Sequence, residues 1–277
     1  SGMGIFSGKR KKEINDEIEF IKNEVEKLNA RHAQNINRIK KEAELKAIGS
    51  SEKISKAEEE LRQEEILHEK NKEGLNIETK NEIEFGSYQE DEEGNIRPII
   101  WSILKKTPDE LLLISKQAID CRKFNEDRSD VTWETCTLRS WLNGEFYDAA
   151  FNDAEKTLID ETTAYADRNS LYNTHPGNKT KDRIFLLSNR EAEMYFLTDE
   201  DRKAVPTGFA ISQGLYTSEE YKTADGEACC WWWLRTPGLD SSRASGVSSD
   251  GSIRASGRYV GGGARAVRPA LVLKLAK

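Results

Sequence analysis

Residues 229–238 read CCWWWLRTPG, three consecutive tryptophans closed by a Pro-Gly turn. Alternate side chains of a β-strand point to opposite faces, so Trp231 and Trp233 share one face and Trp232 takes the other. Tryptophans this close together are either pillars of a core or a stacking platform, and the usual burial of large aromatic side chains favours the core. The stretch therefore predicts a strand packed inside a globular domain.

A segment of different composition follows, residues 239–266, in which 7 Ser, 6 Gly and 4 Arg fill 17 of 28 positions. We call it the display segment. Val247, Ile253 and Val260 recur within it as strand anchors, and the Asp-Gly pair at 250–251 is a hairpin signal. A flexible linker would have no such anchors between two apolar strands. The pattern favours a displayed surface on rigid supports.

The remainder of residues 81–277 has the pattern of short strands mixed with helices. Apolar runs predict strands at 83–85, 99–104, 111–115, 184–187 and 267–273, the last as one closing strand. Capping residues predict helices that begin at Thr135 or Thr137, at Asn152-Asp153 and at Ser188. These elements predict an α+β domain with two or three helices.

Two local predictions concern side chains of this domain. In the second helix, we expect Ala154, Leu158 and Ile159 to face inward. The polar stretch 165–182 is typical of a loop, and His175 within it has no carboxylate or cysteine companion, so we expect it to face solvent.

Residues 1–80 have a different character, with 17 basic and 17 acidic side chains and no Trp or Tyr. Apolar residues spaced 4, 3, 4 and 3 apart between Ile14 and Leu28 predict the narrow seam of a coiled coil. A break at 49–51 precedes a second helix that ends near residue 71. The seam needs a partner, either a hairpin within the arm, another chain or the downstream domain. We favour self-association through residues 13–71; a solvated spacer is the alternative.

Charge separates the two parts of the globular region. Residues 81–230 carry 17 basic and 30 acidic side chains, whereas residues 231–277 carry 8 and 2. The basic residues of the second part are scattered arginines without a Lys/Arg run, so nucleic acid is not favoured as a partner.

Four cysteines, Cys121, Cys136, Cys229 and Cys230, have neither zinc-ligand spacing nor the density of a disulfide scaffold. We expect reduced, buried thiols, with no metal and no cofactor. The chain contains no run of about 20 apolar residues and no apolar run after the basic cluster at 9–12, so neither a membrane span nor a signal peptide is expected. Cytoplasmic residence is the default expectation.

Four pieces in order carry a resemblance: WETCTLRSWLN at 133–143, IFLLS at 184–188, WWLRTPG at 232–238 and VRPAL at 267–271. This series resembles bacterial and phage domains with the C-type lectin-like fold, in particular the variable proteins of diversity-generating retroelements. The resemblance covers most of residues 81–277 and excludes the N-terminal arm. In that family, reverse transcription that misreads adenines rewrites codons near the C-terminus.

The resemblance implies a C-type lectin-like domain preceded by a helical arm. It also implies a variable region at about 235–268 that binds protein or cell-surface targets. The protein would then be located in a phage particle or displayed at a surface, as alternatives to the cytoplasm. Arginine and tyrosine would be the anchors for affinity. Carried over by position, the ligand contacts would be Asp240, Ser241, Ser242, Arg243, Ser245, Gly246, Ser248, Ser249, Ser252, Arg254, Ser256, Arg258, Tyr259, Gly261, Gly262, Gly263 and Arg265.

Two other functions compete with ligand display. The formylglycine-generating oxidases resemble this fold and use a spaced pair of activated thiols, but Cys229 and Cys230 are adjacent and point to opposite faces of a strand, so we expect no enzyme. A structural adaptor that works through its coiled coil is the other alternative. Calcium-dependent sugar binding is not expected either, because the display segment offers only Asp240 and Asp250 as acidic ligands.

Overall fold

The computed structural model describes residues 30–31, 33–37 and 82–275. The chain divides into two units, Ser1–Thr79 and Lys80–Lys277. The few described residues of the first unit are helical, whereas the predicted Ile14–Leu28 seam, the break and the second helix lie outside the described residues. Over the described ranges, no helix combines the length and the apolar character needed to cross a membrane.

The second unit contains a first sheet that holds both ends of the domain. β1 (Glu82–Gln89) and β2 (Ile96–Lys106) form an antiparallel hairpin, and β3 (Glu110–Ser115) continues the meander. β14 (Ala270–Lys274) pairs with β3, and β7 (Ile184–Phe185) completes the order β1-β2-β3-β14-β7. The strands predicted at 83–85, 99–104 and 111–115 are confirmed, whereas the one predicted at 184–187 is shorter and ends at Phe185.

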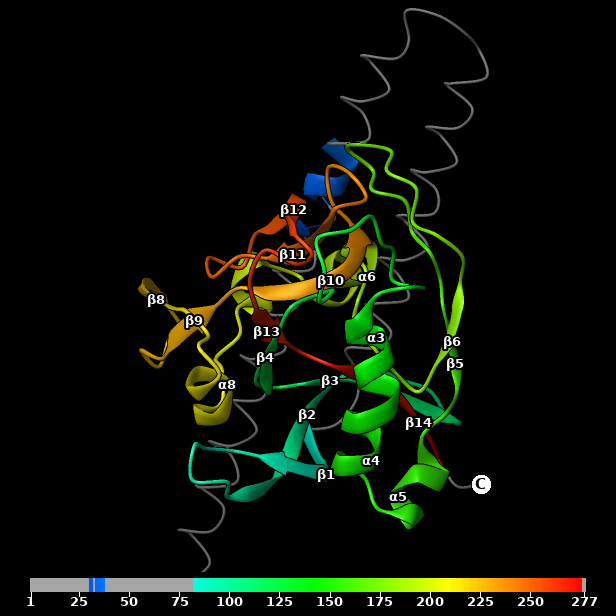
Figure 1. Ribbon diagram of the computed structural model, residues 1–277, viewed down its shortest axis with the longest axis vertical. Coiled ribbons are helices and arrows are strands. Elements are labelled where there is room, and N and C mark those ends of the chain that lie inside the picture. Colours follow the sequence, from blue (N-terminus) through cyan, green and yellow to red (C-terminus); the bar gives the residue numbers. More distant parts are fainter. Residues whose placement is uncertain (1–29, 32, 38–81, 276–277) are drawn as a thin grey trace, which may run out of the picture. The chain divides into compact units, whose positions relative to one another are not determined.

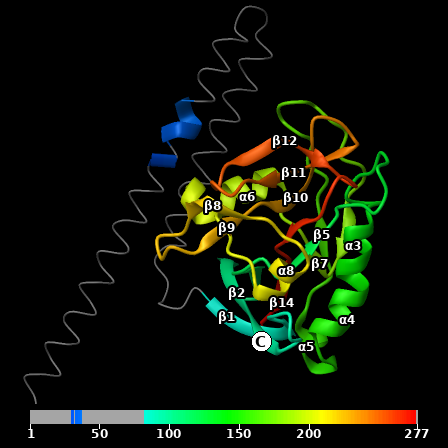
Figure 2. The same cartoon turned by 60° about the vertical axis from the view of Figure 1, so that its left-hand side comes forward.

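The second sheet carries the tryptophan strand at its centre. β10 (Trp232–Pro237) lies between β11 (Arg243–Val247) and β13 (Arg265–Val267); β12 (Ile253–Tyr259) and β4 (Asp120–Arg122) form the edges. Figure 1 and Figure 2 both show this sheet above the first one, with the helices around α3 and α4 along one side. The unit is an α+β domain with mostly strands and few helices.

The predicted single closing strand at 267–273 is wrong, because the chain changes sheets within it. Val267 ends β13 in the second sheet, and Ala270 begins β14 in the first. Pro269 has no N–H to donate to a continuous ladder. The buried Arg268 fixes this link, since its Nε donates to the Ser115 carbonyl at 2.8 Å.

The first helical column is α3 (Thr137–Trp141), a π-helical turn η1 (Leu142–Phe146) and α4 (Tyr147–Ala150). It begins at the second of the two predicted positions, although the cap residue is Cys136, which makes no side-chain capping bond. Trp133 and Arg139, from the motif around this column, both bond Asp182, at 2.9 Å and 2.7 Å, and Asn143 of the same motif donates from Nδ2 to the Ile184 carbonyl of the IFLLS piece at 2.8 Å. Motif pieces far apart in sequence therefore pack together as the frame of the domain.

Two further helices begin at the predicted caps. α5 (Asp153–Leu158) and α6 (Asn189–Tyr195) each have a complete capping box, formed by Asn152 with Glu155 and by Ser188 with Glu191. The inward face predicted for α5 is wrong for Ala154 and Leu158, which are exposed. The helix is too short to present a full face, and only Ile159, just past its end, is buried beside Leu273.

Several short elements carry too little periodicity for a sequence pattern to reveal them. α7 (Asp199–Arg202) and α8 (Gly208–Ser212) raise the number of helices above the two or three expected. β5 (Thr162–Ala164) pairs with β6 (Thr180–Asp182) at the two ends of the predicted 165–182 loop. A further hairpin consists of β8 (Thr217–Lys222) and β9 (Ala228–Cys230).

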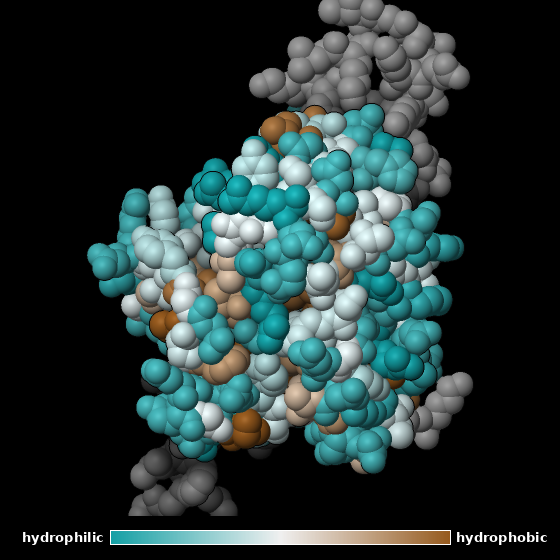
Figure 3. Space-filling model, viewed as in Figure 1, coloured by the Kyte–Doolittle hydropathy of each residue, from teal (hydrophilic) through white to brown (hydrophobic). Residues whose placement is uncertain are grey.

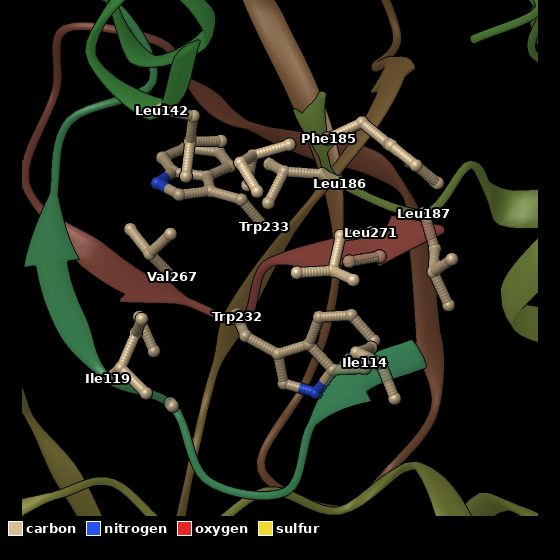
Figure 4. Close-up of a cluster of buried hydrophobic side chains, with 14 of the residues drawn as sticks. Ile114, Ile119, Leu142, Phe185, Leu186, Leu187, Trp232, Trp233, Val267 and Leu271 are labelled. Atoms are coloured by element: carbon tan, nitrogen blue, oxygen red, sulfur yellow. The ribbon is translucent and has the colours of Figure 1, made fainter. Parts of the chain in front are cut away.

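The tryptophans of β10 are pillars of the core, as predicted. Trp232 and Trp233 have no exposed surface, and Figure 4 shows their indoles on opposite sides of the strand, Trp233 toward Leu142 and Trp232 toward Ile114. Trp231 packs edge-on against Trp233 with 4.7 Å between ring centroids, which confirms their shared face. Both buried indole N–H groups of β10 bond backbone carbonyls, so their burial leaves neither donor unpaired.

Candidate binding face on the second sheet

The display segment forms the outer hairpin of the second sheet, β11 followed by the edge strand β12, and the loop that leads into β13. Val247 and Val260 are buried, as predicted, and the third predicted anchor, Ile253, is half-buried and packs against the core. The hairpin turns at Gly251, which has φ +85° and whose missing Cβ would lie 1.7 Å from the Asp199 carbonyl oxygen. Only glycine fits there. In Figure 3, hydrophilic and near-neutral residues cover the region where Figure 1 places β11 and β12.

Most of the predicted contact residues reach the surface. The exposed ones are Asp240, Arg254, Arg258, Tyr259 and Gly262. The half-buried ones are Ser241, Ser242, Arg243, Ser248, Ser249, Ser252, Ser256, Gly261, Gly263 and Arg265.

Ser245 and Gly246 were predicted as ligand contacts, and this is wrong because both are buried. The Ser245 hydroxyl lies 3.1 Å from the Pro237 carbonyl and 3.2 Å from the Ala255 carbonyl, and it accepts a bond from the Asn189 amide. Ser245 therefore ties the three neighbouring strands of the hairpin region together.

Two glycines of the predicted contact set have no room for a side chain. A Cβ at Gly246 would lie 2.0 Å from the Trp231 ring, and one at Gly261 would lie 2.7 Å from backbone atoms of Asp127 and Arg128. A residue that varies at the surface needs space for its side chain. Gly246 and Gly261 are consequently part of the frame and not of a variable surface.

We expect Gly246→Ser to lower the free energy of unfolding by about 1–3 kcal/mol, because the added atoms must displace the Trp231 indole. Gly144→Ser is the matched control: nothing lies within 4 Å of a Cβ at Gly144, so the same change should cost less than about 0.5 kcal/mol. Urea denaturation of both variants measures the difference. Equal losses would mean that Gly246 is not a packing position.

Two loops hold the display segment from either side. In the loop between β5 and β6, the buried Asn169 donates from Nδ2 to the carbonyls of Pro237, Gly238 and Ala255 at 2.8, 3.3 and 2.7 Å. In the loop after β4, the Val131 N–H donates to the Ser241 carbonyl at 3.0 Å. Sequence reasoning missed both supports, and an asparagine in a polar loop gives no signal that it is buried.

Tyr259 lies between two arginines on the face. Its ring is half exposed, and the Arg243 guanidinium lies 4.3 Å from the ring centroid while its Nη2 donates to the tyrosine hydroxyl at 2.8 Å. Arg128, which sequence reasoning did not single out, lies 5.9 Å from the same centroid. Asp240 pairs with Arg243 at 3.8 Å. The aromatic ring is thus held in place while part of it stays accessible to a ligand.

The four cysteines are buried and free, as predicted. Burial raises the pKa of the Cys121 thiol to about 11 and that of Cys136 to about 12, and it also raises the pKa of Cys229 and Cys230. His175 is exposed, as predicted, and its Nδ1 accepts a bond from the Gly177 N–H. Within residues 30–31, 33–37 and 82–275, no three His, Cys, Asp or Glu side chains gather as metal ligands.

We expect all four thiols to resist iodoacetamide in the folded protein near neutral pH, because thiolate is the reactive form and every thiol pKa lies above its ordinary value. Mass spectrometry after a short exposure should find little alkylation, and the urea-unfolded chain, as the control, should be alkylated at every cysteine. Rapid labelling of one cysteine in the native protein would contradict this expectation and would support thiol catalysis.

The fold and this face define a class of protein, a strand-rich α+β domain that presents an exposed hairpin on a tightly packed frame. The chain belongs to the family described as Domain of unknown function (DUF6273), whose model matches residues 108–275. The match includes every strand from β3 to β14 and leaves out the β1–β2 hairpin. Neither a curated protein nor a solved structure is significantly similar to the chain.

Proposed function

We propose that the chain is a non-enzymatic display protein that binds a protein or cell-surface target through the β11–β12 face. In its finer form, the domain has the C-type lectin-like fold and is the variable protein of a diversity-generating retroelement. Self-association through residues 13–71 and location in the cytoplasm, in a phage particle or at a surface belong to this proposal as well.

One observation carries the proposal: frame and surface are separated within a single segment. Val247, Val260, Ser245, Gly246 and Gly251 are buried or have no space for a larger side chain. The polar and aromatic residues between them reach the surface. A segment built to vary needs this separation, since substitutions at the exposed positions leave the packing of the frame unchanged.

Sequencing of the encoding locus tests the proposal. We expect a reverse-transcriptase gene nearby and a near-copy of codons 235–270 that differs almost only at adenines. The differing codons should fall on exposed or half-buried positions such as Ser249, Arg254, Arg258 and Tyr259, and should spare Gly246 and Gly251. A locus without reverse transcriptase and near-copy would overturn the retroelement role and leave a fixed ligand site.

A further inference from the structure

Two arginines project from one face of the second sheet, although they lie on strands that do not touch. Arg258 of β12 is opposite Ala244 of β11, and Gly246, two residues further along β11, is opposite Trp233 of β10. Arg265 precedes Ala266, the partner of Trp232 in the parallel β10–β13 pair, so it shares the face of Trp233. The face that carries Trp233 therefore also carries both guanidinium groups.

Three other arginines of the second sheet already have carboxylate partners. Arg122 pairs with Asp120 at 3.2 Å, Arg254 with Asp250 at 2.9 Å, and Arg243 with Asp240 at 3.8 Å. Within residues 82–275, no carboxylate lies within ion-pair distance of Arg258 or Arg265.

The pair itself is electrostatically unfavourable. Burial and the neighbouring Arg258 charge lower the pKa of Arg265. In the part of the chain that the structure describes, the only hydrogen bond from either guanidinium runs from the Arg265 Nη1 to the carbonyl of Ala264, at 2.8 Å. A bound anion would remove the repulsion between the two guanidinium groups and satisfy their free N–H groups.

We propose that Arg258 and Arg265 form a carboxylate-binding subsite that takes an Asp or Glu side chain of a protein partner. The proposal rests on the display function and names the chemistry of its target. A guanidinium is a planar fork of donors that matches the two oxygens of a carboxylate, and two adjacent forks hold one carboxylate with directed hydrogen bonds.

The surroundings favour a protein carboxylate over a nucleic acid. Residues 81–277 contain 25 basic and 32 acidic side chains, and the exposed Asp127, Asp130 and Asp240 lie on segments that border the face. A long polyanion would be repelled by these acids, whereas a single acidic side chain needs only the two arginines.

An open cleft beside the subsite gives a partner segment further surface. Arg122 is the register partner of Arg265, and its guanidinium lies 3.9 Å from the centroid of the Trp141 ring. Arg122 and Trp141 line the cleft together with Thr137 and Gly144. A chain that places its carboxylate on the two arginines can therefore continue over an aromatic surface.

Fluorescence anisotropy with the full chain tests the subsite. The probe is a labelled synthetic peptide of alternating Glu and Gly, and its Gln-Gly counterpart is the uncharged reference. Arg258→Gln and Arg265→Gln should each weaken binding of the acidic peptide about tenfold, which is the effect of losing a hydrogen bond to a charged group. Arg183→Gln removes the same charge from an arginine that lies outside the display segment and pairs with Glu161 at 3.4 Å, and it should weaken binding less than about twofold.

Every outcome decides the proposal. Equal effects of the three substitutions would overturn it, because the peptide would then respond only to the general charge of the protein. Equal binding of the acidic and the uncharged peptide would also overturn it, because the carboxylate would then not be recognised. A single-stranded oligonucleotide that displaces the acidic peptide at high salt would overturn the protein assignment in favour of nucleic acid. The melting temperatures of the variants test whether they are folded. We expect values close to that of the parent chain, because Arg258 is exposed and Arg265 is half-buried.

The two proposals fail separately. A retroelement template found together with no carboxylate selectivity leaves the display function standing without this subsite. If the chain binds the acidic peptide selectively but its locus has no template, the subsite is part of a fixed binding site.

Discussion

Glu191→Ala is expected to lower the free energy of unfolding by about 3–5 kcal/mol, because it leaves the Arg235 guanidinium buried without its counter-charge. Both Arg235 Nη atoms donate to the Glu191 carboxylate, one of them at 2.7 Å. The arginine side chain has 2% of its surface exposed, so water cannot replace the lost carboxylate. The guanidinium of Arg235 also donates to the Leu186 and Tyr165 carbonyls, which fixes it to the centre of the domain.

The same substitution removes one half of the α6 capping box, since Glu191 accepts from the Ser188 N–H at 3.0 Å. Glu82→Ala is the control, because it removes a carboxylate that bonds Lys116 at 3.0 Å on the surface, where both side chains are roughly half exposed. Its expected cost is about 0–1 kcal/mol. Urea denaturation followed by tryptophan fluorescence measures both. A loss below about 1 kcal/mol for Glu191→Ala would show that the pair is not a net support of the frame.

Asn169→Ala is expected to lower the free energy of unfolding by about 3 kcal/mol, because three carbonyls, two of them in buried residues, lose their common donor. These carbonyls belong to Pro237, Gly238 and Ala255, so the amide of one loop joins the end of β10 to the edge strand β12. The Asn169 Oδ1 in turn accepts from the Leu171 N–H at 3.1 Å, which shapes the loop itself. We therefore also expect faster hydrogen exchange at Leu171 and Leu239.

Asn178→Ala is the matched control for this substitution, since Asn178 lies in the same loop but is exposed and bonds the Glu134 carboxylate at the surface. It should change stability far less than Asn169→Ala. Comparable losses from the two asparagines would mean that the loop is not held through Asn169. A second variant, Asn169→Asp, keeps the acceptor but faces the three carbonyls with oxygen instead of N–H, and should be at least as destabilising as Asn169→Ala.

Together these variants distinguish residues that stabilise the frame from residues that bind a ligand. Glu191 and Asn169 act on the frame and are not among the predicted ligand contacts, whereas Arg258 and Arg265 act on the face alone. A ligand that still binds a destabilised but folded Asn169→Ala protein with lower affinity would show that the position of the β5–β6 loop matters for the face.

Local sequence patterns are enough to predict much of this domain. Alternation placed Trp231 and Trp233 on one face, and the capping residues Asn152 and Ser188 marked two helix starts, because both rules depend on residues within one turn or strand. The Asp-Gly pair at 250–251 marked the hairpin for the same reason.

Contacts between distant segments fix which residues of the display segment reach the surface. Ser245 and Ser249 are the same residue type in the same hairpin, yet the first is buried among three strands and the second is half-buried. Gly246 is excluded from variation by Trp231, and Gly261 by a loop more than a hundred residues away in the sequence. Local patterns are sufficient to predict the short elements and the faces of their side chains. The split of the closing strand at Pro269, the burial of Asn169 and the shared face of Arg258 and Arg265 depend on contacts between distant segments, which no local pattern encodes.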